Sequence, residues 1–332
     1  MSQGIRTAAP TRRSPASQAT RLSARLASDA SPLVLDGATG TELERAGLST
    51  GLPLWSTHAL LEAPECVYRI HAAYLAAGAE IVTANTFRTQ RRTLARGGLA
   101  SADARLTRLA VDLARRAAAD ATPCSALPLA TACEVPRARW VAGSLPPLED
   151  CYRPDRVPAD RALTAEHERQ VDLLGEAGVD LILIESMNTI RESRAAARAA
   201  SRTGLPFVVS FVAWDGAKLL SGEPLVRAAR DALDLGAAAV GVNCLPIANL
   251  DACRQALSSL AAPLLVSPNL GQPEPTTGFA RDESHDPARF PAALADWIEG
   301  SAAIVGGCCG TTPAHIAALA AKVRGGVGER GR

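Results

Sequence analysis

The residues best suited to chemistry in this sequence are three cysteines, Cys244 and the adjacent pair Cys308 and Cys309. Three thiolates can take three corners of a zinc tetrahedron and leave the fourth corner open, which is the arrangement of a catalytic zinc site. The pair stands in the run Gly306-Gly-Cys-Cys-Gly, whose glycines let the backbone bend so that two adjacent sulfur atoms face one ion. A regular strand would point them to opposite faces. We therefore predict that these three cysteines bind a catalytic Zn²⁺.

Two carboxylates, Asp36 and Glu185, follow two other aliphatic runs. Together they can hold an ammonium group or work as an acid and base pair. Glu185 follows Leu-Ile-Leu-Ile directly, where a carboxylate needs a partner, whereas Asp36 before Gly37 can also simply shape a turn. The backbone amides from Gly37 through Thr39 to Thr41 can donate to a substrate carboxylate.

The elements that must position these residues repeat along the chain. From residue 31 onward, short aliphatic runs alternate with longer segments of helical period, which is the pattern of βα units on a parallel sheet. Eight strands are expected, at residues 33–35, 80–84, 138–142, 180–184, 206–211, 238–242, 263–266 and 302–305. Helices are expected near 57–77, 103–121, 164–177, 191–203, 224–235, 249–260, 288–299 and 313–323.

Eight such units predict an α/β fold, the (β/α)8 TIM barrel. The alternative is an open doubly wound sheet, but Asp36-Gly-Ala-Thr-Gly-Thr lacks the G-x-G-x-x-G spacing of a dinucleotide loop. Reactive groups in a barrel stand at the carboxyl ends of the strands. The predicted ends carry Asp36, Asn85, Glu185, Cys244, Asn269 and the cysteine pair. Two long, Pro-containing connections, 143–160 with Cys151-Tyr-Arg-Pro-Asp and 267–287, are expected on the same rim.

The chain is expected to form a single barrel domain at 31–325, between a disordered extension at 1–30 and a flexible tail at 326–332. Residues 1–30 contain five arginines and one acid among Ser, Ala, Thr and Pro, too little apolar surface to fold alone. The same composition suits an organellar transit peptide. However, the whole chain prefers arginine to lysine, so the bias is not special to the N-terminus.

Charge and composition indicate a small-molecule partner. The 332 residues include 35 basic and 34 acidic ones, a net charge of +1, so no broad field favours nucleic acid or an anionic membrane. No apolar run approaches the roughly 20 residues that span a bilayer. Eight cysteines without a signal-peptide core predict reduced thiols and a cytoplasmic location. We expect a monomer or a small homo-oligomer.

These residues resemble those of the homocysteine S-methyltransferases, which include the S-methylmethionine and betaine enzymes and the homocysteine module of cobalamin-dependent methionine synthase. The resemblance covers about residues 32–324. The resemblance rests on seven sequence motifs: Leu35-Asp-Gly-Ala-Thr-Gly-Thr-Glu-Leu, Pro53-Leu-Trp-Ser, Thr83-Ala-Asn-Thr-Phe, Ile184-Glu-Ser, Gly241-Val-Asn-Cys, Pro268-Asn and Gly306-Gly-Cys-Cys-Gly-Thr-Thr-Pro.

The resemblance implies that the three cysteines bind zinc and that Asp36 and Glu185 hold the homocysteine amino group. It also implies that Asn269 can occupy the fourth zinc position before the substrate arrives. Where the betaine enzymes have aromatic hydroxyls, this chain has Arg88 and Ser186, and only 23 residues follow Cys309 where those enzymes carry an oligomerisation arm. A small cationic donor, S-methylmethionine or S-adenosylmethionine, is therefore favoured over betaine, and no cobalamin or folate module fits in the chain.

Three further residues are expected to contact substrate. Asn85 and Arg88 lie at and after the end of the second strand, and the guanidinium of Arg88 can pair with the carboxylate of an amino-acid donor. Trp55 can place its ring against a sulfonium or simply pack.

Other functions stay open at this point. The cysteine pair can pack in a core, form a redox-active disulfide, or close a structural zinc site in a thiol-binding barrel without catalysis. A zinc hydrolase is a further alternative. It usually relies on His and Asp ligands, and none of the five histidines falls at a predicted strand end.

Overall fold

The computed structural model describes residues 15–28, 31–121, 139–214, 217–272, 280–281, 286–300 and 302–325. Its core is a sheet of eight parallel strands in the order β1-β10-β7-β6-β5-β4-β3-β2, and a bridge between Leu35 and Ile81 joins the first strand to the last. The strands are β1 Leu33–Val34, β2 Ile81–Ala84, β3 Trp140–Leu145, β4 Leu181–Met187, β5 Phe207–Phe211, β6 Ala239–Pro246, β7 Leu264–Asn269 and β10 Ala302–Val305. The sheet is a TIM barrel, as the repeat of βα units predicts.

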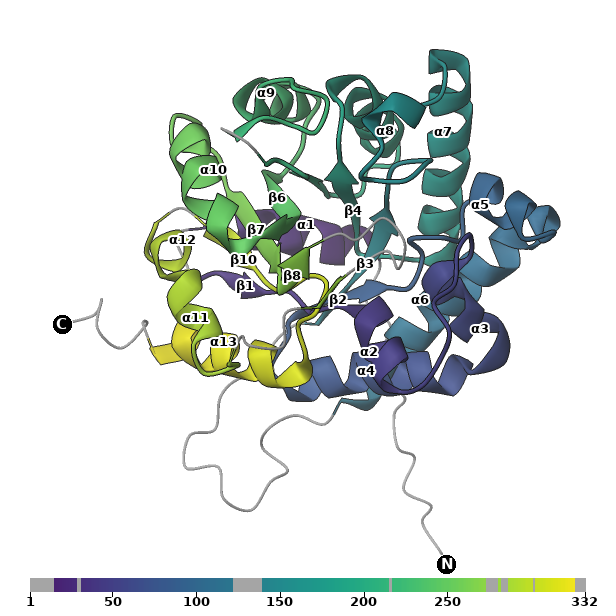
Figure 1. Cartoon of the computed structure of the whole chain (residues 1–332), viewed down its shortest axis with the longest axis horizontal. Helices are drawn as coiled ribbons and strands as arrows, with labels where there is room; N and C mark the ends of the chain where they lie inside the picture. The colour runs from purple at the N-terminus through teal and green to yellow at the C-terminus, as the bar shows by residue number, and fades with distance from the viewer. Residues whose placement is uncertain are drawn as a thin grey trace, which may run out of the picture.

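Helices surround these strands (Figure 1). They are α2 Thr39–Arg45, α3 His58–Glu62, α4 Pro64–Ala76, α5 Arg91–Arg96, α6 Asp103–Asp120, α7 Asp160–Ala177, α8 Ile190–Ser201, α9 Leu225–Asp234, α10 Leu250–Leu257, α11 Phe290–Ala293, α12 Ala295–Glu299 and α13 Pro313–Gly325. Three glycines that follow helices, Gly78, Gly178 and Gly236, have positive φ angles. They end the helices by the left-handed turn that the sequence predicts.

The predicted helix boundaries differ from the structure in three places. The helix expected at 57–77 is divided between α3 and α4, because Pro64 has no N–H to continue a helix and instead begins α4. The helix expected at 288–299 is two short helices, α11 and α12. Two short helices, α2 and α5, were not predicted.

The strands bury alternate residues on their two faces. One face packs on the helices, as with Val34, Val82 and Val240, which belong to the large core cluster. The other face forms a second cluster that includes Leu35 and Leu183. The period of two in these strands therefore separates an outer core from the barrel interior.

The prediction that residues 1–30 are disordered is wrong for residues 15–26, which form helix α1 (Pro15–Leu26). Leu22 and Leu26 are four residues apart and therefore share one helix face, and they are 0% and 2% exposed. They join the interior cluster of the barrel, and Figure 1 shows α1 behind the strands. The helix is stable because the barrel offers an apolar surface that the isolated segment lacks. Residues 1–14 and the predicted tail at 326–332 lie outside the described residues.

Candidate metal centre and substrate pocket

The three predicted cysteine ligands lie together. Cys244 belongs to the end of β6, and Cys308 and Cys309 follow β10. Their Sγ atoms all lie within 4.8 Å of one another, and those of Cys244 and Cys308 are 3.1 Å apart. Ligands of a tetrahedral zinc with Zn–S bonds of about 2.3 Å are about 3.8 Å apart, so the three thiols fit such an ion after small side-chain movements. Within the described ranges, no other set of three His, Cys, Asp or Glu side chains is grouped in this way.

Hydrogen bonds among the thiols favour one thiolate. The contacts from Cys308 and Cys309 hold the pKa of Cys244 well below its usual range. The same contacts raise the pKa of Cys308 and of Cys309. Because the thiolate is the form that ligates a metal, the cluster holds one ligand in its binding form.

Local backbone irregularity turns Cys244 toward the barrel mouth. Cys244 has a φ of 57°, and the pairing of β6 with β7 shifts between Asn243 and Pro246. The resulting bulge lets two consecutive side chains, those of Asn243 and Cys244, serve the same site. In the segment after β10, a Cβ added to Gly307 would lie 2.5 Å from Thr311 Oγ1, so a glycine is needed before the cysteine pair.

The thiols line a cavity of about 490 Å³ at the carboxyl ends of the strands, together with Asp36 and Glu185. Asp36 accepts hydrogen bonds from Thr83 N at 2.7 Å and Thr83 Oγ1 at 2.9 Å. Glu185 accepts hydrogen bonds from Ser144 Oγ and, at 3.3 Å, from Asn243 Nδ2.

Burial is the main cause of the raised pKa values of both acids. Desolvation raises the pKa of Asp36 to about 7, although the Thr83 hydrogen bonds oppose it. Desolvation also raises the pKa of Glu185 to about 8, against the Ser144 hydrogen bond and with a contribution from Cys244. A cationic ligand in the cavity would stabilise the ionised forms and reverse these shifts.

Other predicted substrate contacts also reach the cavity: Gly37, Thr39, Trp55, Asn85 and Arg88 are among its lining residues. The ring of Trp55 lies 5.5 Å from that of Phe87 in an edge-on arrangement. Both polar atoms of the Asn85 amide bond to Ser56, with Oδ1 accepting at 2.6 Å and Nδ2 donating at 2.9 Å. Asn85 thus holds the turn that carries Trp55.

Asn269 lies behind the cysteine pair and is not among the residues that line the cavity. It is 1% exposed, and its Oδ1 accepts a hydrogen bond from Cys309 N at 3.1 Å. Its Nδ2 has no hydrogen-bond partner among the residues that the structure describes. Its role as a fourth metal ligand stays a prediction.

Sequence reasoning missed Tyr152 as a site residue. This half-buried side chain comes from the connection between β3 and α7, and its hydroxyl donates to the carbonyl oxygen of Cys244 at 3.5 Å. Its ring centroid lies 6.0 Å from that of Trp214, which also lines the cavity. The Cys151-Tyr-Arg-Pro-Asp run was a visible signal of an unusual connection, but nothing in it indicated contact with the cysteines.

Fold and site together define a barrel protein with a candidate thiolate metal centre beside two acids, the buried Asp36 and the half-buried Glu185. The family model described as homocysteine S-methyltransferase matches residues 33–323. The chain belongs to this family, and it is a methyltransferase.

Curated relatives match over most of their length. The homocysteine S-methyltransferase of Escherichia coli is 35% identical over 309 residues, which cover 87% of this chain and 94% of the relative. The homocysteine S-methyltransferase YbgG of Bacillus subtilis is 31% identical over 308 residues, with 88% and 94% covered.

A solved structure of similar sequence supports the same family. The metallated form of the homocysteine methyltransferase MmuM from Escherichia coli superimposes with a TM-score of 0.75 at 31% identity, covering 89% of this chain and 97% of that one. The family resemblance drawn from the motifs is thereby confirmed.

Among the described residues, the six cysteines outside segment 122–138 are all free thiols. Within the same ranges, no helix is long and apolar enough to cross a membrane.

Proposed function

We propose that this protein transfers a methyl group from a small sulfonium, S-methylmethionine or S-adenosylmethionine, to the thiol of homocysteine and so produces methionine. The observation that carries this proposal is the placement of three thiols within 4.8 Å of one another in a cavity shared with the acids Asp36 and Glu185. Sulfur ligands suit a site that binds a sulfur substrate, and the acids suit an α-ammonium group.

Cys244, Cys308 and Cys309 would hold a zinc ion. When bound, the zinc would take the acceptor sulfur as a fourth thiolate ligand and keep it nucleophilic at neutral pH, where a free alkyl thiol is mostly protonated. The cavity is the side of the cysteine cluster that remains open to substrate.

Asp36 and Glu185 would bind the ammonium group of homocysteine from two walls of the barrel, at the ends of β1 and β4. Thr83 and Ser144 hold the two carboxyl groups in place through the hydrogen bonds described above. An ammonium between them would replace the lost hydration of both carboxylates. The protein would thereby fix the acceptor sulfur, so that much of the rate comes from alignment with the methyl carbon.

The hydrolase alternative receives no support from the cavity. None of the described residues lining it is a histidine, the residue that zinc hydrolases use most to bind their metal. His71 and His167 are both fully buried, on helices α4 and α7.

The test is an assay of zinc-loaded protein with homocysteine and, in turn, S-methylmethionine, S-adenosylmethionine and betaine. We expect methionine from the two sulfonium donors and much less from betaine. No methionine from any donor would refute the methyl transfer, whereas a preference for betaine would refute only the donor assignment.

A further inference from the structure

We propose that Arg88, Tyr152 and Trp214 form the donor subsite of the cavity and that this subsite takes a sulfonium carrying a free carboxylate. The inference rests on the proposed methyl transfer and specifies its second substrate. Each of the three residues lines the cavity, and each comes from a different connection: after β2, after β3 and after β5.

Arg88 is a cation without a matching anion. Among the described residues, no carboxylate forms an ion pair with it, and its Nε is buried without a hydrogen-bond partner. Its Nη1 donates only a long hydrogen bond, 3.4 Å, to the carbonyl oxygen of Glu149. The Glu149 carboxylate is already engaged by Arg92 and Arg96. A half-buried guanidinium whose Nε is buried without a partner is costly unless a ligand supplies an anion, and its fork matches a carboxylate.

Tyr152 and Trp214 place two aromatic rings beside the thiol cluster. Their centroids are 6.0 Å apart, with the planes inclined at 45°. The Tyr152 hydroxyl contacts the backbone of Cys244, so this pair lies next to the point where the acceptor sulfur must sit. Aromatic faces attract cations, and a sulfonium against them would be close to the acceptor. Trp214 Nε1 is a second buried donor without a partner in the described part of the chain, and a donor carboxylate or hydroxyl can satisfy it.

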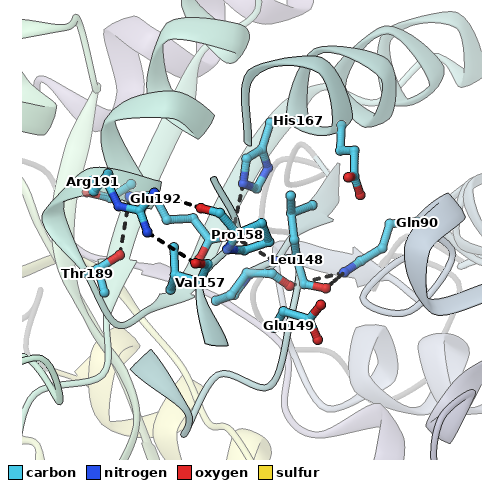
Figure 2. Close-up of polar contacts among 12 residues, drawn as sticks. Gln90, Leu148, Glu149, Val157, Pro158, His167, Thr189, Arg191 and Glu192 are labelled. Atoms are coloured by element: carbon cyan, nitrogen blue, oxygen red, sulfur yellow. Dashed lines mark hydrogen bonds and ion pairs between the residues drawn. The ribbon is translucent and has the colours of Figure 1, made fainter. Parts of the chain in front are cut away.

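Hydrogen bonds within the protein hold the connection that carries Tyr152, and Figure 2 shows those around Leu148. Leu148 N donates to Glu192 Oε1 at 2.8 Å, and His167 Nε2 lies 3.2 Å from the same oxygen. Gln90 Nε2 donates to the carbonyl oxygen of Leu148 at 3.3 Å.

Two more tethers hold the same connection. Arg191 donates to the carbonyl oxygens of Val157 and Pro158, at 3.1 and 2.7 Å. Nearer to the ring, Asn188 Nδ2 donates to the carbonyl oxygen of Cys151 at 2.9 Å. A side chain fixed in this way binds without a further ordering cost.

The charges of the two subsites are complementary to two different substrate ends. Asp36 and Glu185 favour the ammonium of the acceptor and repel a carboxylate, whereas Arg88 attracts one. Homocysteine and an amino-acid donor both carry an ammonium and a carboxylate, so their sulfur atoms separate them: the acceptor thiol goes to the cysteine cluster and the donor sulfonium to the aromatic rings. Arg88 would then bind the carboxylate of the donor.

The first experiment compares Arg88→Met with wild type, using S-methylmethionine and its methyl ester, which lacks the carboxylate charge. With saturating homocysteine, we expect kcat/KM for S-methylmethionine to fall about ten- to a hundredfold, the range of a charge-assisted hydrogen bond. The value for the ester should change less than about threefold, and zinc content should not change. Arg91→Met, an exposed arginine of α5, is the matched control and should behave like wild type.

Each outcome is decisive. An equal loss for both donors, or no loss for S-methylmethionine, overturns the assignment of Arg88 while the wild-type methyl transfer stands. A wild type that makes no methionine from any donor overturns both the subsite and the proposed function.

The second experiment separates the Tyr152 ring from its hydroxyl. Calorimetry should show S-methylmethionine binding to Tyr152→Phe within about threefold of wild type and binding to Tyr152→Leu about five- to thirtyfold more weakly, because only the latter lacks the ring. Homocysteine affinity and the thermal midpoint of both variants serve as checks on the fold. Equal donor affinity in the two variants would contradict a cation-binding role for the ring.

Discussion

The Sγ atoms of Cys244 and Cys308 lie 3.1 Å apart although 64 residues separate them in the chain. Their strands, β6 and β10, pair with opposite edges of the same strand, β7. Cys308 N also donates to the carbonyl oxygen of Pro268 in β7, which ties the cysteine pair to that strand. The site therefore exists only when three parallel strands have assembled, and metal binding should stabilise the closed barrel.

Replacing any one of the three cysteines should abolish the metal site. We expect Cys244→Ala, Cys308→Ala and Cys309→Ala each to weaken zinc binding more than about a hundredfold and to lose methyl transfer, because two thiolates cannot hold the ion tightly. Metal analysis of the purified proteins measures this. Cys66→Ala, on α4 and away from the cavity, is the control and should retain zinc. Full occupancy in all three site variants would show that these cysteines are not the ligands.

Neutral replacements of the two acids should separate substrate binding from metal binding. Asp36→Asn and Glu185→Gln should keep zinc but weaken homocysteine about ten- to a hundredfold, since a charge-assisted contact to the ammonium contributes roughly 1.5–3 kcal/mol. An alkyl thiol without an amino group, used as the acceptor, should be affected far less. If the affinities for both acceptors fell by the same factor, the two acids would shape the cavity but would not bind the amino group.

The barrel could be predicted from the sequence because each strand is an aliphatic run with a clear helical segment after it. The ends of the strands were less predictable. Strands β3, β4, β6 and β7 each continue past the expected end, to Leu145, Met187, Pro246 and Asn269, through residues such as Ser144, Glu185 and Cys244 that follow the hydrophobic pattern. The residues that break the pattern are the ones that form the site.

Two features depend on contacts that no local pattern contains. Tyr152 reaches the cysteines because Glu192 and Asn188, more than thirty residues later, hold its connection in place. Helix α1 depends on two leucines in a polar segment, and their burial requires the open end of a completed barrel. Composition alone indicated disorder there.

A buried histidine outside the site should make the free energy of unfolding decrease as the pH is lowered. His71 is 0% exposed, neither ring nitrogen has a hydrogen-bond partner within the described ranges, and burial lowers its pKa from 6.5 to about 4. Below pH 6.5, His71 binds a proton in the unfolded chain but not in the folded protein, which binds it only near pH 4. The free energy of unfolding therefore decreases as the pH falls from 6.5 to 4.

From pH 7 to 5 this single histidine should cost about 2 kcal/mol of unfolding free energy, a loss that His71→Leu would not show. Urea unfolding of both proteins at the two pH values measures the difference. Leu61→Ala, which changes an exposed side chain of α3 that has no titratable group, should keep the wild-type pH dependence. Identical pH dependence in wild type and His71→Leu would mean that His71 is protonated in the folded protein.

The last prediction tests whether α1 is part of the domain. Leu22→Ala and Leu26→Ala should each lower the unfolding free energy by about 2–5 kcal/mol, the usual cost of truncating a fully buried leucine. Leu61→Ala, whose side chain is 38% exposed, should change it by less than about 0.5 kcal/mol. Leu22 and Leu26 pack with the apolar interior cluster and are not themselves among the described residues that line the cavity, so kcat and zinc content of the folded variants should stay close to those of wild type. Denaturant unfolding with the m-value compared across variants decides the matter: losses no larger than that of Leu61→Ala would mean that α1 does not contribute to the barrel's stability.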